Sequence, residues 1–122
     1  MDVQAIRTAL KIQAPDGWTP YDHLPGAAML PALVVGLPDR ITLKTASLFE
    51  LELPLILVVA TPYSPEGEGR LLTAAIEAAA AYKGLTGDSF RSCTWTSIDR
   101  FVSVTVGRIA ATAAHVNLTI IA

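Results

Sequence analysis

Apolar and polar positions at the start of the chain alternate with a helical period and then give way to a proline-containing segment. Val3, Ile6 and Leu10 recur at helical spacing, and Asp2 before them is a good N-cap. A helix is therefore expected to open the chain. The stretch 18–29 contains two prolines and a glycine, which predicts an ordered loop pinned by its two aromatic side chains.

Three strands are predicted between this loop and the middle of the chain. The run 30–37 is rich in Val and Leu and stops at Pro38, which indicates a first strand. After a turn-like 38–40, the segment 41–45 alternates between apolar and polar residues and indicates a second strand. The longest of the three is expected over 48–60.

The strand expected over 48–60 has two different faces. All its odd positions from 49 to 59 are apolar, whereas the opposite face carries Glu50 and Glu52 and becomes apolar after Pro54. The first half of the strand should therefore have one solvent-exposed face, and the second half should be buried on both faces. Because proline cannot donate to a sheet ladder, Pro54 indicates a bulge or an edge register at the changeover.

A second helix is expected to begin at Ser64-Pro65-Glu66 and to end at Gly84. Ser64 is the expected cap, proline suits the first helical position, and an acid suits the helix dipole. Five alanines between positions 74 and 80 make this helix slim enough to lie close to a sheet. Its expected apolar stripe is Leu72, Ile76, Ala79 and Tyr82.

The rest of the chain predicts a strand pair. Residues 92–97 start a strand that 98–100 continue or bulge, and 101–106 complete it. The turn 107–108 leads into a last strand over 110–121, giving a hairpin with one apolar and one polar face. The expected order is α-β-β-β-α-β-β in a single domain, 1–122. This is an α+β fold in which two helices pack on a mostly antiparallel sheet of about five strands.

Composition changes this picture by pointing to partners. Charged residues make up only 16% of the 122 residues, below the roughly 25% typical of soluble domains. Some apolar surface should therefore face a partner rather than water. The net charge of −2 gives no reason to expect nucleic-acid binding. The longest apolar run, 53–60, is too short to span a bilayer, so no membrane partner is expected.

Three residues with side chains capable of catalysis or metal binding have no evident partner in the sequence. Cys93 is the only cysteine, which excludes an internal disulfide and favours a small buried hydrophobe. His23 falls in the expected loop and His115 on a polar strand face, and neither has a second ligand at helical or strand spacing. No catalytic, cofactor-binding or metal-binding residue is therefore assigned, and an enzyme is not expected.

Glu50 and Glu52 share one strand face about 7 Å apart, a separation that paired catalytic acids can have. No aromatic platform for a sugar accompanies them. The favoured interpretation is a solvated face or a charge pair with Lys44 on the neighbouring strand. Charged side chains expected at contacts with other subunits or partners are Asp39, Arg40, Lys44, Glu50, Glu52, Arg91, Asp99 and Arg100.

The run Leu30-Pro31-Ala32-Leu33-Val34-Val35-Gly36-Leu37-Pro38, after a short helix and a proline-containing loop, resembles the start of tail terminator proteins of long-tailed actinobacterial phages. These are also called tail completion or head–tail joining proteins. The apolar strand 51–60, the alanine-rich helix and the closing hairpin follow in the same order as in that family. The resemblance covers nearly the whole chain and carries no catalytic motif.

The resemblance implies a structural virion protein that forms a ring, expected to be hexameric, on the tail tube. The ring would stop tube elongation and join the tail to the head connector, at the neck of a virion assembled in the host cytoplasm. Implied partners are further copies of the chain, the major tail tube protein and a head-side connector or stopper protein. Phage DNA would pass through the lumen without specific binding.

Two alternatives stay open at this point. The first is a neighbouring neck component, either a head-closure stopper or an adaptor. The second is a small α+β enzyme or ligand-binding domain, which needs a polar pocket with a perturbed acid or histidine. The first suspects for such a pocket are His115 with Glu50 or Glu52.

Overall fold

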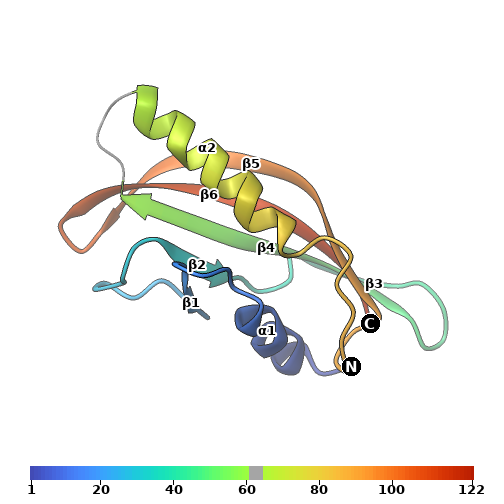
Figure 1. The fold of residues 1–122 in the computed structure, drawn as a ribbon. Coiled ribbons are helices and arrows are strands. Elements are labelled where there is room, and N and C mark those ends of the chain that lie inside the picture. The colour runs from blue at the N-terminus through green and yellow to red at the C-terminus, as the bar shows by residue number, and fades with distance from the viewer. Residues whose placement is uncertain (61–64) are drawn as a thin grey trace.

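The first helix begins where the sequence predicts it, because the Asp2 side chain accepts a hydrogen bond from the N–H of Ala5 at 3.1 Å. The computed structural model describes residues 1–60 and 65–122 (Figure 1). The elements in chain order are α1 (Val3–Ile12), β1 (Thr19–Tyr21), β2 (Ala32–Val35), β3 (Arg40–Leu43), β4 (Phe49–Ala60), α2 (Pro65–Ala80), β5 (Ser92–Val106) and β6 (Ile109–Ile121). The expected cap Ser64 lies outside the described residues.

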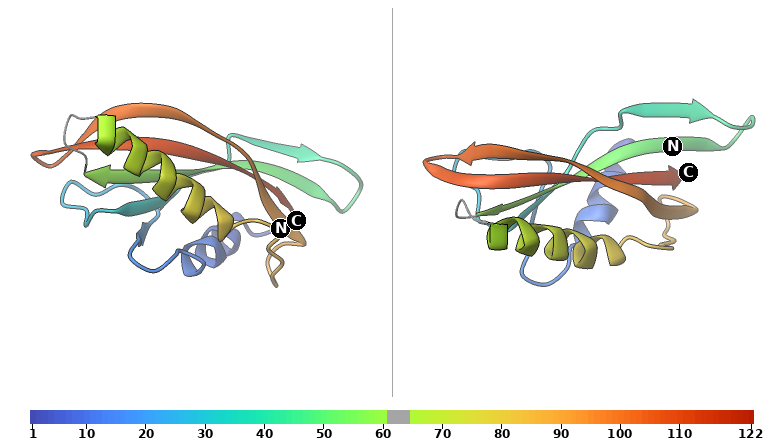
Figure 2. Two further views of the ribbon diagram at one scale, coloured as in Figure 1. Left: turned by 45° about the horizontal axis from the view of Figure 1, so that its top comes forward. Right: turned by 90° about the horizontal axis from the view of Figure 1, so that it is seen from above.

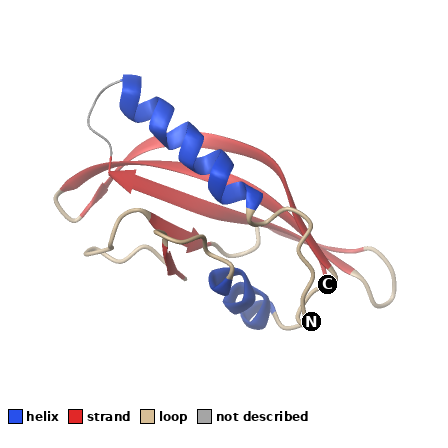
Figure 3. Cartoon of the chain, in the orientation of Figure 1, coloured by secondary structure: helices blue, strands red, loops and turns tan. Residues whose placement is uncertain are grey.

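Six strands form one sheet with the order β1-β2-β4-β6-β5, and β3 also pairs with β4 (Figure 3). The β1–β2 pair is parallel, and the other pairs are antiparallel. The predicted α+β class with a mostly antiparallel sheet is therefore confirmed. The β3–β4 turn and the β5–β6 turn lie at opposite ends of the sheet (Figure 1).

The prediction of a loop over 18–29 is wrong in one part, because β1 lies within it. Pro20 argues against a strand in the sequence, yet β1 is at the sheet edge, where a missing N–H is tolerated. The aromatic residues do hold this segment in place. Trp18 packs against the main core, and the Tyr21 hydroxyl accepts a hydrogen bond from the N–H of Met29 at 2.9 Å.

Pro54 lies where one side of β4 changes its partner. Residues 55–58 pair with β2 and residues 49–52 pair with β3, whereas β6 pairs along the other side without a register shift. The Pro54 carbonyl accepts the N–H of Gly36 at 2.9 Å. The missing N–H of the proline therefore falls between the two partner strands. The edge register is confirmed, and the bulge is wrong.

Both helices pack on one face of the sheet (Figure 2). The odd-numbered face of β4 is buried there, as predicted, together with the even-numbered face of β6. In the turn after α2, the buried Tyr82 hydroxyl donates to the Leu10 carbonyl of α1 at 2.9 Å. Cys93 lies fully buried in the same core, which confirms its interpretation as a small hydrophobe.

The predicted stripe of α2 is displaced by one position at its start. Leu72 and Ile76 are 47% and 51% exposed, whereas the buried residues are Leu71, Ala75, Ala78, Ala79 and Tyr82. Both sets have helical spacing. The buried set presents three alanines to the sheet, which lets the helix backbone approach closely. Two large apolar side chains are consequently left on the exposed side of the helix.

The sheet face opposite the helices, called the outer face below, is covered over only part of its area. Ala32, Val58, Val106, Ala111 and Ala113 form a second buried cluster there, and residues of the β1–β2 connection pack against it. The covered second half predicted for β4 is thus confirmed. The predicted polar face of the last strand is apolar over this part and polar only further along.

Strand β5 is continuous but irregular. Its register against β6 shifts between Trp95 and Ser97 and again between Asp99 and Val102, which confirms the bulge predicted near 98–100. Arg100 in the second shift has φ 55. Because β5 is an edge strand, these irregularities and the charges beside them protect the edge from continuous pairing with another strand.

Candidate functional site on the outer face

A groove of about 460 Å³ crosses the uncovered part of the outer face. Apolar side chains of β2, β4, β5 and β6 line it, among them Ile56 and Val102. The segment after β1 contributes Asp22 and His23, and β6 contributes His115. The fold therefore brings both histidines of the chain to one groove, although 92 positions separate them in the sequence.

His115 does not lie beside the two glutamates proposed as its partners. Its register neighbours are Ile56 on β4 and Asp99 on β5, whereas Glu52 lies opposite Thr119, four residues further along β6. Four residues of strand correspond to about 13 Å. The pairing of His115 with Glu50 or Glu52 is therefore wrong. The prediction did not include Asp99 as a neighbour of His115, because the alignment of β5 with β6 depends on two register shifts.

Burial lowers the pKa of His115, and the nearby Arg100 lowers it further, while Asp99 and Asp39 act in the opposite direction. The imidazole is therefore predominantly neutral at pH 7. In this state it has one donor and one acceptor nitrogen for hydrogen bonding. Chemically, the groove combines an apolar floor with a neutral imidazole at its edge.

Asp22 lies at the groove and forms an ion pair with Lys11 of α1. Its Oδ2 lies 3.1 Å from the Lys11 ammonium, whereas its buried Oδ1 has no hydrogen-bond partner among the described residues. The backbone carbonyl of Asp22 accepts a hydrogen bond from the buried Arg7 guanidinium at 2.8 Å. Arg7 also donates to the carbonyls of Val35 and Gly36. No sequence pattern points to this arginine, which lies at the buried side of α1.

A second, smaller hollow of about 240 Å³ lies further along the outer face and is mainly polar. Asp39, Glu52, Ser97, Asn117 and Thr119 contribute to its lining. The Asn117 amide donates to the Ser97 hydroxyl at 2.9 Å. Hydrogen-bonding groups here are thus partly used within the chain.

The charged residues expected at contacts are distributed mostly along this face. Lys44 and Glu50 lie 3.1 Å apart, which confirms the predicted charge pair, and Arg40 and Glu52 lie 3.7 Å apart. Asp39 lies at the polar hollow, and Asp99 and Arg100 lie near His115. Arg91 is remote from them, before the start of β5. Whether any of these residues contacts a partner stays a prediction.

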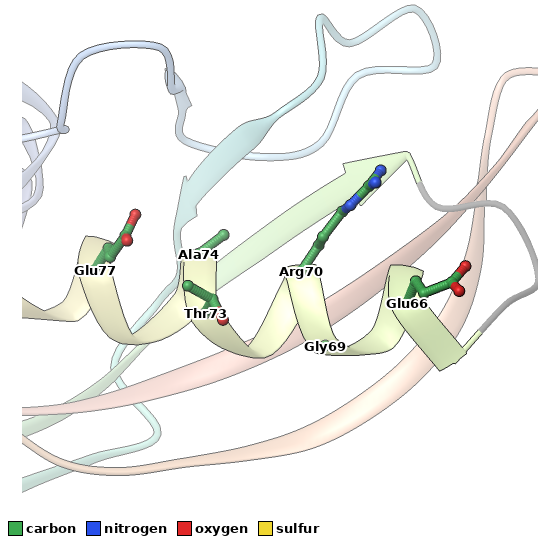
Figure 4. Close-up of a pocket in the computed structure, with 6 residues that line it drawn as sticks. All are labelled: Glu66, Gly69, Arg70, Thr73, Ala74 and Glu77. Atoms are coloured by element: carbon green, nitrogen blue, oxygen red, sulfur yellow. The ribbon is translucent and has the colours of Figure 1, made fainter.

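A third depression follows α2 on the helix-bearing side of the sheet. It has a volume of about 540 Å³ and is open to solvent. Its lining residues are Glu66, Gly69, Arg70, Thr73, Ala74 and Glu77. Figure 4 shows Arg70 and Glu77 projecting from the same side of the helix, so this side carries charges of both signs.

Among residues 1–60 and 65–122, no group of three or more His, Cys, Asp or Glu side chains is placed to hold a metal ion. Neither helix, over its described residues, has the length and apolar character needed to cross a membrane. No family model matches the chain, and no curated protein is found that matches it.

Proposed function

We propose that the chain is a structural assembly protein that forms a homo-oligomeric ring, specifically the tail terminator at the head–tail junction of a long-tailed phage. In this role a ring, hexameric by the resemblance, caps the tail tube and stops its elongation. It joins the tail to the head connector and lets DNA pass through its lumen. The proposal places the protein in the neck of the virion.

The observation that carries the proposal is the distribution of exposed large apolar side chains. Ile41 and Leu43 are 46% and 61% exposed on β3. Leu72 and Ile76 are exposed on α2, and a further set is exposed near the β5–β6 turn. A ring built by head-to-tail contacts needs at least two different apolar patches on each subunit. Low overall charge adds support, because few charges have to be removed from water when subunits meet.

Light scattering after size-exclusion chromatography tests the proposal, with the purified chain alone and with the major tail tube protein from the same genome. The expected result is a ring, either free or formed on the tube, and tubes of regulated length. A chain that stays monomeric under both conditions, with unregulated tube length, overturns the proposal. Binding only to head-side proteins instead identifies a stopper or adaptor.

The groove favours a second candidate function, a small ligand-binding domain. Its volume lies within the roughly 300–1,000 Å³ common for small-molecule sites, and His115 supplies a polar group at its edge. The variant His115→Ala separates the two functions. A ring protein retains assembly and tube capping in this variant, whereas a ligand-binding domain loses affinity for its ligand.

A further inference from the structure

The exposed side of α2 has an apolar row and a charged row. Leu72 and Ile76 are four residues apart and lie on one flank, whereas Glu66, Arg70 and Glu77 follow the other flank. Gly69 and Thr73 lie between the rows. The five residues of the two rows are called the helix patch. Its three charged residues have a net charge of −1, and none has an ion-pair partner within residues 1–60 and 65–122.

The distal half of the β5–β6 hairpin has the complementary composition. Val102 and Ile109 are 46% and 53% exposed, and both lie on the outer face, because their cross-strand partners Ala113 and Val106 belong to its buried cluster. Arg100 and Arg108 accompany them, and neither guanidinium has an ion-pair partner in the described part of the chain. These four residues are called the hairpin patch. It has a charge of +2, which the neighbouring Asp99 reduces to +1.

We propose that the helix patch of one copy binds the hairpin patch of a second copy. Both patches are apolar, and their charges are opposite in sign. Such a contact buries apolar area and places each arginine near a glutamate, so it gives both affinity and orientation. The proposal rests on the proposed ring function and assigns the contact through which the ring closes.

The dimensions of the two patches agree. Glu66 and Glu77 are eleven residues apart, which is about 16 Å along a helix. Arg100 and the β5–β6 turn are separated by six to seven residues of strand, about 20 Å. Long arginine side chains span the remaining difference. The charged pairs can therefore form at both ends of the apolar contact.

The helix patch and the hairpin patch of one copy do not bind each other. Helix α2 lies on its own sheet (Figure 2). Its buried residues are on the side opposite the helix patch, so the patch is on the side away from the sheet. A copy that uses its hairpin patch on one neighbour keeps its helix patch free for another. The contact is therefore heterologous and repeats from copy to copy, which generates a closed ring when the rotation allows closure.

Complementary charge reversal tests the contact. The helix variant carries Glu66→Lys and Glu77→Lys, and the hairpin variant carries Arg100→Glu and Arg108→Glu. All four side chains are exposed, so both variants should keep the wild-type circular dichroism and unfolding curve. In sedimentation experiments over a concentration series, each variant alone should associate at least tenfold more weakly than wild type. An equimolar mixture should recover association.

The apolar component is tested separately with Leu72→Ser and Ile76→Ser together, which should also weaken association at least tenfold. Ile12→Ser is the matched control, because Ile12 is 76% exposed but belongs to neither patch. Association of this control should equal that of wild type.

The outcomes distinguish the contact from the function. Oligomers that persist unchanged in both charge variants overturn the contact and leave the ring function standing. Patch-dependent oligomers that leave tail-tube length unregulated support the contact and overturn the terminator function. A wild-type chain that associates neither alone nor with the tail tube protein overturns both.

Discussion

Gly36 and Pro54 are in contact across the point where β4 changes partners. The N–H of Gly36 donates to the Pro54 carbonyl at 2.9 Å, and a β-carbon added at position 36 would lie 2.8 Å from Cγ of Pro54 and 2.9 Å from its carbonyl oxygen. Since one of these atoms belongs to the backbone, the neighbour cannot move aside easily. The sheet at this point accepts glycine alone.

We therefore expect Gly36→Ala to destabilise the fold by about 1–3 kcal/mol, the range of overpacking in a well-packed site. Urea unfolding at equilibrium measures the effect. Gly26→Ala is the matched control, because a β-carbon there meets nothing within 4 Å, and its midpoint should stay close to that of wild type. Equal midpoints for the two variants would contradict the argument.

Sequence patterns predicted those parts of the fold that depend on local spacing. The cap at Asp2, the two-faced strand β4 and the Lys44–Glu50 pair all follow from residues close together in the chain. The buried side of α2 did not, because two overlapping rows have helical spacing and only the sheet decides between them. Edge strand β1 was not predicted, because Pro20 argues against a strand. At a sheet edge its missing N–H matters less.

The candidate site was predicted less completely than the fold. Exposed charges along the outer face could be selected from strand alternation alone. The groove could not, since it depends on which segment covers the outer face and on the register shifts of β5. His23 and His115 meet at the groove through these long-range relations, and no sequence spacing encodes them.

Arg7 is expected to be a main determinant of stability at the junction of α1 and β2. It is only 8% exposed, and its guanidinium donates to the backbone carbonyls of Asp22, Val35 and Gly36. Arg7→Met removes these charged hydrogen bonds and should cost about 2–4 kcal/mol. Arg7→Lys should recover only part of this loss, because an ammonium lacks the planar fork of donors.

The control for Arg7 is Arg91→Met, because Arg91 is an exposed arginine whose side chain has no hydrogen bond or ion pair in the described part of the chain. Its effect on the free energy of unfolding should stay within about 0.5 kcal/mol. A similar loss in both variants would show that arginine content, rather than the buried network, sets the stability.

Acidification should destabilise the fold through His115. Burial, with Arg100 beside it, holds the pKa of this imidazole below its ordinary value of 6.5. The unfolded chain therefore binds a proton first, and the stabilisation present above pH 6.5 is lost as the pH falls through the lowered value. Unfolding curves between pH 7.5 and 5 measure the effect, and His115→Asn should flatten their pH dependence in this window.

The neighbouring charges allow a sharper test of the same group by NMR titration. Arg100→Gln removes a nearby positive charge, so the pKa of His115 should move up towards its ordinary value. Asp99→Asn removes a negative charge and should move the pKa further down. Shifts of the same sign in both variants would contradict this account of the groove.

Cys93 should link stability to alkaline pH. Burial raises the pKa of its thiol from 9.0 to about 11, because a thiolate in the core loses its hydration. The stabilisation is complete below pH 9 and is lost as the pH rises through 11, since the unfolded chain releases the proton first. The loss should be on the order of 2 kcal/mol.

Cys93→Ala should remove this loss from the pH dependence of unfolding. Tyr82 remains in that variant, and burial raises the pKa of its hydroxyl as well, so a residual decline above pH 10 is expected. At pH 8, a thiol reagent should modify wild-type Cys93 only as fast as the chain opens, whereas rapid modification of the folded chain would place the side chain outside the core.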